Sequence, residues 1–296
     1  MRDLKLFSFF EWLQLIPLKM LWKQIRNDLW LRVYLKKNSR QEEKFKSRYA
    51  YLKGSPVLLI VAFEQPKVLS WALKACTKHL HGWQPLVFDN SRNTKLRGEI
   101  AQVCEDFDVP YLELPYNFSR HPNRSHGMAM TWIYHHIVRF LEPNYFGFLD
   151  HDMVLMQEID LIKKLNNQSC YGLKKGMLPP YWNLWAGYCF YDFKEVNSLP
   201  LNYLYDFSSG LDTGGRNWPH LYKNIDPNDF TTALMEYWIM NLPHGPSYRV
   251  QLLDDAWIHI GAVSYNQNFE KKEEVFDKLF KMIDQGEDLR RYRTDS

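Results

Sequence analysis

Two aspartates, Asp150 and Asp152, interrupt an apolar stretch in the sequence FGFLDHDMVL, residues 146–155. A carboxylate beside apolar chain is unfavourable unless a partner compensates its charge. The stretch before the pair is typical of a buried strand, and both carboxylates can turn toward one point beyond its end. Oxygen ligands of this kind suit Mn²⁺ or Mg²⁺, which bind one or two carboxylates together with phosphate oxygens of a substrate. The pair therefore predicts a cation site for a diphosphate, although two acids that cap local backbone would give the same pattern.

The surrounding sequence alternates apolar runs with helical patterns, and this alternation decides between the two interpretations. It predicts an α/β fold with a doubly wound, mostly parallel central sheet. Ligands of such sheets bind beyond the carboxyl ends of the strands, where Asp150, Asp152 and also Asp89 in VFDNS stand. Strands are expected at residues 56–63, 85–88, 109–114, 145–149 and 256–260, and helices at residues 66–80, 94–107 and, capped by Ser125, from there to about residue 140.

Composition narrows the class of protein. The chain has 296 residues, of which 46% are hydrophobic and 16% aromatic, so it can bury a large core and is not a disordered protein. Its four cysteines form no C-x-x-C pair. This spacing predicts a reduced, cytoplasmic protein without structural zinc.

The basic charge is confined to the N-terminal segment. Residues 1–53 carry 13 Lys/Arg against 5 Asp/Glu, so the rest of the chain is acidic and no nucleic-acid partner is expected. In residues 1–37, Phe, Trp and Leu alternate with Lys and Arg, as in a helix that lies at a membrane interface. The longest uncharged run, residues 12–18, is too short to span a bilayer. Contact with the cytoplasmic membrane face is one expectation, and an amphipathic helix docked on the domain or in a dimer is the other.

These patterns divide the chain into three parts. Residues 1–53 form an amphipathic, basic, helical segment, whose part 36–53 is expected to be a linker or a solvated helix end. Residues 54–265 form the α/β domain, and residues 266–296 form a charged C-terminal helix.

An ordered set of segments, VLLIVAF, PLVFDNSRN, PNRSHGMAMTWIYHHI and YFGFLDHDMVL, resembles the nucleotide-sugar half of glycosyltransferases with the GT-A fold. The likeness is closest to the bacterial transferases of glycosyltransferase family 2 and covers about residues 55–265. It implies a GT-A-type sheet followed by an acceptor-side C-terminal half. It also implies metal-dependent transfer of a sugar from a nucleoside-diphosphate sugar, which we expect to be UDP-linked, to a glycan or lipid-linked acceptor.

The resemblance also assigns roles to residues at matching places. The cation ligands would be Asp150, Asp152 and a late histidine, His259 in WIHIGAVS. His151 would touch the ribose or point away. Nucleotide-sugar contacts would come from Asp89, Asn123, Ser125, Gly127, Asp150 and His151.

An inverting transferase needs a general base for the acceptor hydroxyl, and a carboxylate is the usual group. The E-D pair common in the family is missing between the D-x-D and the late histidine. Asp212 in LDTGG is the best candidate, since the adjacent glycines allow a ligand to approach, but it could equally order a turn. Asp254 and Asp255 are rivals, and without a placed base a retaining mechanism stays open.

Three aromatic residues of YWNLWAGY, Trp182, Trp185 and Tyr188, could stack on an acceptor sugar or simply pack in the core. A sugar-nucleotide pyrophosphorylase is disfavoured, because EQPKVLS after the first strand lacks the glycine-rich phosphate loop. The non-enzymatic alternative is a catalytically silent GT-A domain that serves as a membrane-peripheral scaffold. That alternative predicts loss of the key acids, yet both aspartates of the D-x-D are present.

Overall fold

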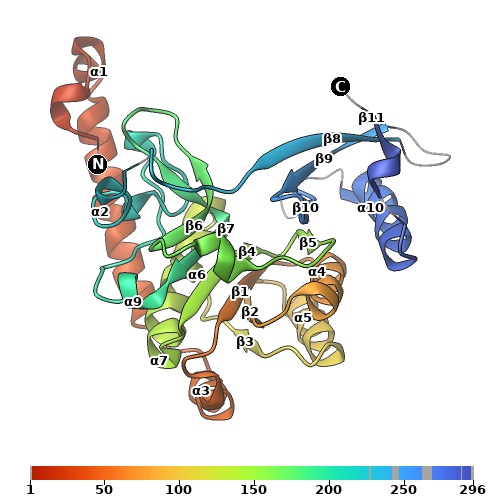
Figure 1. The fold of residues 1–296 in the computed structure, drawn as a ribbon. Coiled ribbons are helices and arrows are strands. Elements are labelled where there is room, and N and C mark those ends of the chain that lie inside the picture. The colour runs from red at the N-terminus through yellow and green to blue at the C-terminus, as the bar shows by residue number, and fades with distance from the viewer. Residues whose placement is uncertain (1, 227, 242–246, 262–268, 288, 295–296) are drawn as a thin grey trace.

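The computed structural model describes residues 2–226, 228–241, 247–261, 269–287 and 289–294 (Figure 1). Its centre is a six-stranded sheet with the order β3-β2-β1-β4-β7-β6. The strands β1, β2, β3 and β4 are mutually parallel, and β7 runs antiparallel to both β4 and β6. The prediction of a mixed α/β fold with a mainly parallel sheet is confirmed. The strands of this sheet are β1 (Val57–Ala62), β2 (Gln84–Asp89), β3 (Tyr111–Glu113), β4 (Tyr145–Asp150), β6 (Cys170–Lys175) and β7 (Asn183–Asp192).

The central strand β1 is buried along its whole length, because helices cover both faces of the sheet. Its side chains alternate between two cores. Leu58 and Ile60 belong to the core beneath α4 (Pro66–His79) and α5 (Thr94–Asp106). Leu59 and Val61 belong to the core beneath α6 (Pro122–Ile133). A strand buried on both faces reads as one continuous apolar run, which is why VLLIVA was recognisable from sequence.

The start of α6 differs from the prediction. The helix begins at Pro122, and the side chain of His121, not that of Ser125, accepts the hydrogen bond from the backbone N–H of Arg124. Proline suits the first helical turn because it has no N–H to satisfy. Ser125 therefore lies one turn inside the helix and is buried. The helix continues through a π-helical turn (Tyr134–Val138) into α7 (Arg139–Leu141).

The C-terminal part of the chain, whose sequence shows less regular patterns, forms most of a second sheet. It is antiparallel with the order β11-β8-β9-β10-β5. Only residues 151 and 152 separate β4, in the first sheet, from β5, in the second. The predicted strand at 256–260 corresponds to β10, but the long hairpin of β8 and β9 was missed. The strands of this sheet are β5 (Met153–Leu155), β8 (Met235–Asn241), β9 (Ser247–Leu253), β10 (Trp257–His259) and β11 (Arg293–Thr294).

The C-terminal helix α10 (Phe269–Asp284) agrees with the predicted charged helix, and it buries Phe276 and Leu279 against the core shared with β8 and β9. The predicted boundary at residues 265–266 lies outside the described residues. Shorter elements are α8 (Leu161–Leu165), α9 (Phe193–Val196) and the turns η4 (Phe207–Ser209), η5 (Gly215–Asn217), η6 (Tyr222–Asn224) and η7 (Leu289–Tyr292).

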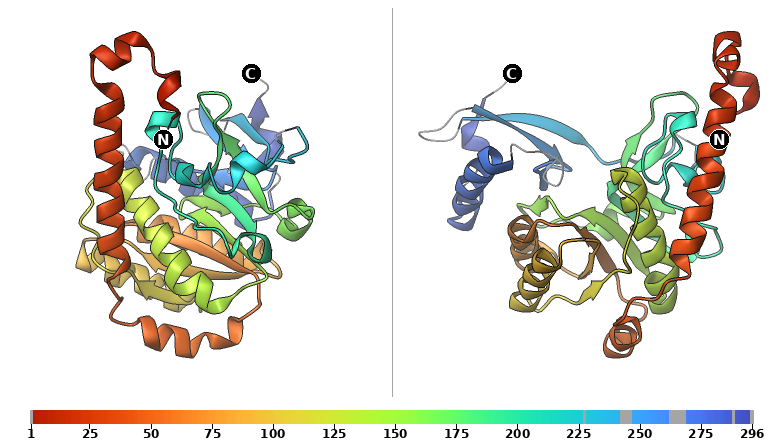
Figure 2. Two further views of the ribbon diagram at one scale, coloured as in Figure 1. Left: turned by 90° about the vertical axis from the view of Figure 1, so that its left-hand side faces the viewer. Right: turned by 180° about the vertical axis from the view of Figure 1, so that it is seen from behind.

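The N-terminal segment is helical, as predicted. It consists of η1 (Leu4–Leu6), α1 (Phe9–Leu13), α2 (Ile16–Leu35), α3 (Glu42–Arg48) and η2 (Ala50–Leu52). The helix α2 runs along one side of the molecule, and α1 folds back at its N-terminal end (Figure 2). Residues 36–53 are not a linker, because α3 buries Phe45 and pairs the buried carboxylate of Glu42 with Lys46 at 2.6 Å. In the described part of the chain, no helix combines the length and apolarity needed to cross a membrane.

Candidate functional site

A cavity of about 230 Å³ lies beyond the carboxyl ends of β1 and β4. This is the edge at which a doubly wound sheet binds its ligands. Several distant segments meet there: the first turn of α6, the turn between β4 and β5, the strand β7, the loop at 212–213 and the strand β10. The lining residues are Val61, Phe63, Pro122, Asn123, His126, Asp150, His151, Asp152, Trp185, Ala186, Asp212, Thr213 and His259.

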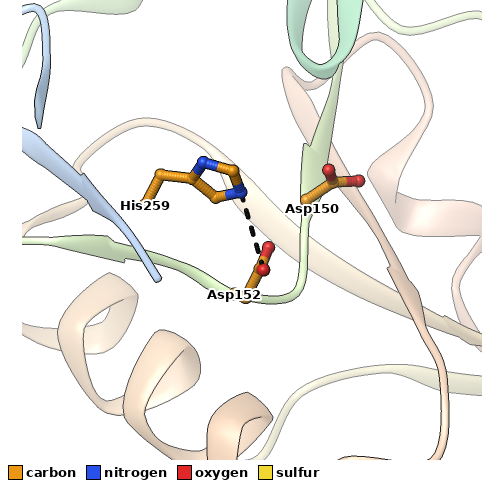
Figure 3. A group of neighbouring side chains, drawn as sticks. All are labelled: Asp150, Asp152 and His259. Carbon is orange, nitrogen blue, oxygen red and sulfur yellow. Dashed lines mark ion pairs between the residues drawn. The ribbon is translucent and has the colours of Figure 1, made fainter. Parts of the chain in front are cut away.

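Strand register brings His259 to the aspartates, more than a hundred residues away in sequence. β10 pairs with β5 so that His259 stands opposite Met153, directly after Asp152. The backbone N–H of Ile260 donates to the carbonyl of Asp152 at 3.0 Å and fixes this register. Figure 3 shows the result: Nε2 of His259 lies 3.5 Å from Oδ2 of Asp152, with Asp150 beside them. The other ring nitrogen, Nδ1, lies 2.6 Å from Oε1 of Gln251, which orients the imidazole.

These three side chains form a donor set that fits a divalent cation. One ligand atom from each of Asp150, Asp152 and His259 lies within 4.8 Å of the others. Two carboxylates and an imidazole suit Mn²⁺ and tolerate Mg²⁺, and three protein ligands leave positions for phosphate oxygens. Gly187 on β7 contributes space, because a Cβ at that position would collide with Oδ2 of Asp150.

The two acids of the cluster have pKa values shifted in opposite directions. Burial raises the pKa of Asp150, although the neighbouring imidazole of His126, 3.5 Å from Oδ1, works in the opposite direction. Burial also disfavours the charge on Asp152, but His259 outweighs it and lowers the pKa of Asp152 to about 2. Burial opposes the imidazolium of His259 in turn, and the Asp152 carboxylate still holds the pKa of His259 above its ordinary value. Without a cation, the imidazolium of His259 thus compensates the negative charge of Asp152.

Asp212 lines the same cavity as the cluster. Its Oδ1 accepts hydrogen bonds from Nδ2 of Asn123 and from the backbone N–H of Thr213, the latter at 2.7 Å. The described hydrogen bonds to Asp212 all go to Oδ1, which leaves Oδ2 available to accept a proton. The side chain is exposed to solvent at the cavity rim.

Trp185 is the one residue of the predicted aromatic platform that lines the cavity. Its half-buried ring packs edge-on against His259, with 4.8 Å between ring centres. The ammonium of Lys175 stands 4.7 Å over the same indole. Burial lowers the pKa of Lys175, while the carboxylates of Asp212 and Asp150 favour its charged form. A cation therefore stands near the anionic cavity in addition to any bound metal.

The acceptor prediction is wrong for Tyr188 and Trp182. Tyr188 is fully buried, and its hydroxyl donates to Oδ2 of Asp254 at 2.9 Å. Trp182 is buried against the rings of Tyr222 and Phe230. Trp182 belongs to the core beneath α6 and Tyr188 to the core beneath α4 and α5, so neither presents a face to a ligand.

The nucleoside prediction for Asp89 is not supported either. Its side chain has no exposed surface, and burial raises its pKa. Its Oδ1 accepts from the backbone N–H of Ser91 at 2.8 Å, and its Oδ2 accepts from the hydroxyl of Tyr111 at 3.0 Å. Asp89 thus stabilises the end of β2 from within the protein.

Two residues predicted on α6 face away from the cavity. The hydroxyl of Ser125 accepts from Nδ2 of Asn90 at 3.1 Å, and this bond joins the helix to the loop after β2. Gly127 allows the helix to touch the backbone of Tyr203, where a Cβ would collide. Residues three apart share a helix face, so Asn123 and His126 line the cavity together, whereas Ser125 and Gly127 are not among its lining residues.

His151 lines the cavity, although it is mostly buried, and its Nδ1 lies 3.2 Å from the carbonyl of Val61. The rivals of Asp212 lie outside the cavity. Asp254 accepts from the hydroxyls of Tyr171 and Tyr188, and Asp255 is exposed on the turn before β10.

Sequence reasoning missed His126 and Lys175. His126 was recoverable, because it follows Asn123 by three residues on a helix that begins at Pro122. Lys175 was not, because its place over Trp185 depends on the β6–β7 hairpin, in which Lys175 pairs with Asn183.

No protein-family model and no curated protein matches the sequence. Solved structures with a partial likeness include S. aureus TarS, at 15% identity and a TM-score of 0.29 over 43% of this chain. A mannosyltransferase from Pyrobaculum calidifontis, PcManGT, in complex with GDP-Man and Mn²⁺, shares 10% identity at a TM-score of 0.39 over 61% of this chain. The glycosyltransferase GlyE in Streptococcus pneumoniae TIGR4 shares 11% identity at a TM-score of 0.34 over 60% of this chain.

The chain covers 23%, 54% and 41% of these three structures, respectively. The last two are described as a mannosyltransferase and a glycosyltransferase. TM-scores this low carry no argument about function, so the proposal below depends on the side chains of this protein and on the resemblance seen in its sequence.

Proposed function

We propose that the protein is a metal-dependent glycosyltransferase of GT-A type that uses a nucleoside-diphosphate sugar as donor. The observation that carries this proposal is the convergence of Asp150, Asp152 and His259 at the sheet edge, with Asp212 in the lining of the same cavity. A cation cluster and a separate, hydrogen-bonded carboxylate are the two groups that a metal-dependent, inverting sugar transfer uses: one for the leaving diphosphate and one for the acceptor proton.

The donor side would be built around the cation cluster. Mn²⁺ or Mg²⁺ bound there would stabilise the negative charge that develops on the departing diphosphate. Asn123 in the first turn of α6 and His126 one turn later line the cavity, and helix N-termini favour anionic groups. Lys175 adds positive charge near the cavity. Together these groups suit a diphosphate, and we propose UDP as the nucleotide on the strength of the sequence resemblance.

The acceptor side would be served by Asp212. In an inverting transfer, an acceptor hydroxyl oxygen forms a bond to the anomeric carbon while the bond from that carbon to the diphosphate breaks. The hydroxyl proton passes to Oδ2 of Asp212, and the electron pair of the broken bond leaves with the diphosphate. The hydrogen bonds from Asn123 and Thr213 to Oδ1 hold the carboxylate for this step. Trp185 offers an indole on which a sugar ring of a glycan or lipid-linked acceptor can stack.

A donor-hydrolysis screen tests this function. The protein is incubated with Mn²⁺ and UDP-, GDP- or dTDP-linked sugars, and the released nucleoside diphosphate is measured with and without EDTA. The proposal predicts release from one donor class that EDTA abolishes and that Asp152→Asn loses. Release that survives EDTA, or no release and no thermal stabilisation by any donor, would contradict it and favour a silent domain.

A further inference from the structure

The N-terminal helix α2 carries two apolar faces on opposite sides, and only one of them has a partner in the fold. The inner face packs on the body of the protein through Leu31 and Tyr34, which are buried. The other face is exposed along the full length of the helix. We call this the outer stripe, and it consists of Leu18, Leu21, Trp22, Ile25, Leu29 and Val33.

The outer stripe is extensive for a water-exposed surface. Trp22 is 66% exposed and Leu29 is 60% exposed. The preceding helix α1, which contacts α2, carries two more exposed rings, Phe9 and Phe10, which are 73% and 72% exposed. Contiguous apolar surface of this kind marks a contact site, in contrast to the scattered apolar residues of ordinary surfaces.

The charges around the outer stripe are almost all positive. Lysine and arginine stand exposed next to it at positions 19, 23, 32 and 36, and Lys5 is exposed before α1. Of the three acidic residues in 2–37, Asp3 alone is exposed. Glu11 pairs with Arg2 at 3.0 Å, and Asp28 pairs with Arg216 at 3.2 Å. The surface thus combines exposed aromatic and aliphatic side chains with positive charge.

We infer that α1 and the outer stripe dock the protein on an anionic lipid surface, with the axis of α2 along the membrane plane. Exposed Trp and Phe enter the headgroup region, and the surrounding lysines meet anionic headgroups. A second copy of the chain fits less well, because two outer stripes in contact would oppose their lysines to one another.

The docking surface is joined to the acceptor side of the cavity. The backbone N–H of Arg2 donates to Oγ of Ser208 at 3.1 Å, and Nε2 of Gln24 donates to Oδ1 of Asp206 at 3.0 Å. Asp206 in turn pairs with Leu211, directly before Asp212. If the proposed transferase function holds, its acceptor is therefore lipid-linked and reaches Asp212 from the membrane side, a consequence that rests on that function.

The first test measures vesicle binding and needs no enzymatic activity, so it can fail independently of the proposed function. The full chain is sedimented with vesicles of phosphatidylcholine, alone or mixed with phosphatidylglycerol. We expect binding to the mixed vesicles, weakened by salt, and reduced about tenfold or more by Trp22→Asp with Leu29→Asp. The matched control is Leu234→Asp, which changes a leucine that is 68% exposed on another surface.

The second test reverses charge. Lys19→Glu with Lys23→Glu should lower binding to the mixed vesicles by about fivefold or more for each lysine, whereas Lys95→Glu on α5 should not. Circular dichroism and the thermal midpoint confirm that each variant is folded. Equal binding of the wild type and the outer-stripe variant would overturn the inference. A concentration-dependent dimer that only the outer-stripe variant loses would overturn it in favour of self-association.

Discussion

The turn between β4 and β5 and the outer stripe of α2 both break the usual rule that charged side chains are exposed and apolar side chains are buried, each in the opposite way. The turn holds acidic side chains in a cavity, and the stripe exposes tryptophan and leucine to water. The turn joins two sheets, and the backbone N–H of Ile260, directly after β10, donates to the carbonyl of Asp152 within it. The stripe belongs to a helix that is anchored by its opposite face. In both regions the side chains are in an unfavourable environment: carboxylates lie close together, or apolar groups face water. A partner outside the chain would relieve this.

The comparison also shows which partner each region calls for. Clustered carboxylates are compensated by a cation, and an apolar surface ringed by lysines is compensated by anionic lipid. Substitutions that change only the cavity beside the β4–β5 turn, or only the outer stripe, test whether the two regions act independently.

The largest effect is expected in the cavity, for Asp212→Asn. Loss of a general base lowers the transfer rate by about 10²- to 10⁴-fold, whereas Mn²⁺ binding should be unchanged because Asp212 is not a ligand. Transfer kinetics and metal titration on the same sample separate the two quantities. Asp255→Asn, in the exposed rival, is the control and should retain activity. Wild-type kinetics in Asp212→Asn would mean that another group takes the proton.

The two faces of α2 give the next largest contrast, in the free energy of unfolding. Leu31→Ala removes a buried side chain and should lower this free energy by about 2–5 kcal/mol. Leu29→Ala, two positions away on the outer stripe, should change it by less than about 0.5 kcal/mol. Denaturant titration measures both variants. Equal losses would show that the outer stripe is packed in solution, against both its exposure and the proposed docking.

A smaller effect is expected for Gly187→Ala, which moves the carboxylate of Asp150 without removing it. The new Cβ would collide with Oδ2, so we expect a loss of about tenfold or more in Mn²⁺ affinity while the fold is retained. Gly98→Ala on α5 is the matched control, because its Cβ meets no atom within 4 Å. Undiminished Mn²⁺ affinity in Gly187→Ala would place the cation away from Asp150.

The pH dependence is the most gradual effect. His259 must be neutral to bind a metal, and its pKa is raised, so Mn²⁺ affinity should fall by about tenfold per pH unit below that pKa. The metal-free protein should show the opposite trend. Its His259–Asp152 pair stabilises the fold fully below the ordinary histidine pKa of about 6.5, and this contribution is lost as pH rises through the raised value.

Because the pKa of Asp152 is about 2, this carboxylate stays charged over that range and withdraws its contribution only as pH falls through that value. Thermal midpoints across pH, with and without Mn²⁺, measure both trends. Parallel trends in the two series would contradict the assignment of His259 as a ligand.

The parallel half of the fold was predictable because its signals are local. The strand β1 is apolar on both faces, and Asp150 and Asp152 follow a strand whose end is marked by the change from apolar to charged residues. The β8–β9 hairpin was missed because Met235, Glu236 and Tyr237 on β8 are incompletely buried, so no regular alternation marks the strand.

The site was predictable where residues lie at strand ends and less so where helix phase decides. His259 was placed by resemblance, and the β5–β10 register supplies the physical reason. Ser125 and Gly127 were assigned by their position in a motif. In the structure they lie on the side of α6 that contacts Asn90 and the backbone of Tyr203. Tyr188 and Asp89 carry polar groups that sequence cannot distinguish from ligands, and the structure shows internal hydrogen-bond partners for each.

Direct titration of Mn²⁺ tests the central claim most closely. The electron paramagnetic resonance signal of free Mn²⁺ is followed as metal is added to the wild type, Asp152→Asn, His259→Ala and the control Asp255→Asn. The account predicts one tight site in the wild type and in Asp255→Asn that is lost in Asp152→Asn and weakened in His259→Ala. Added UDP or GDP should tighten that site. Equal Mn²⁺ binding by the wild type and Asp152→Asn would contradict the account.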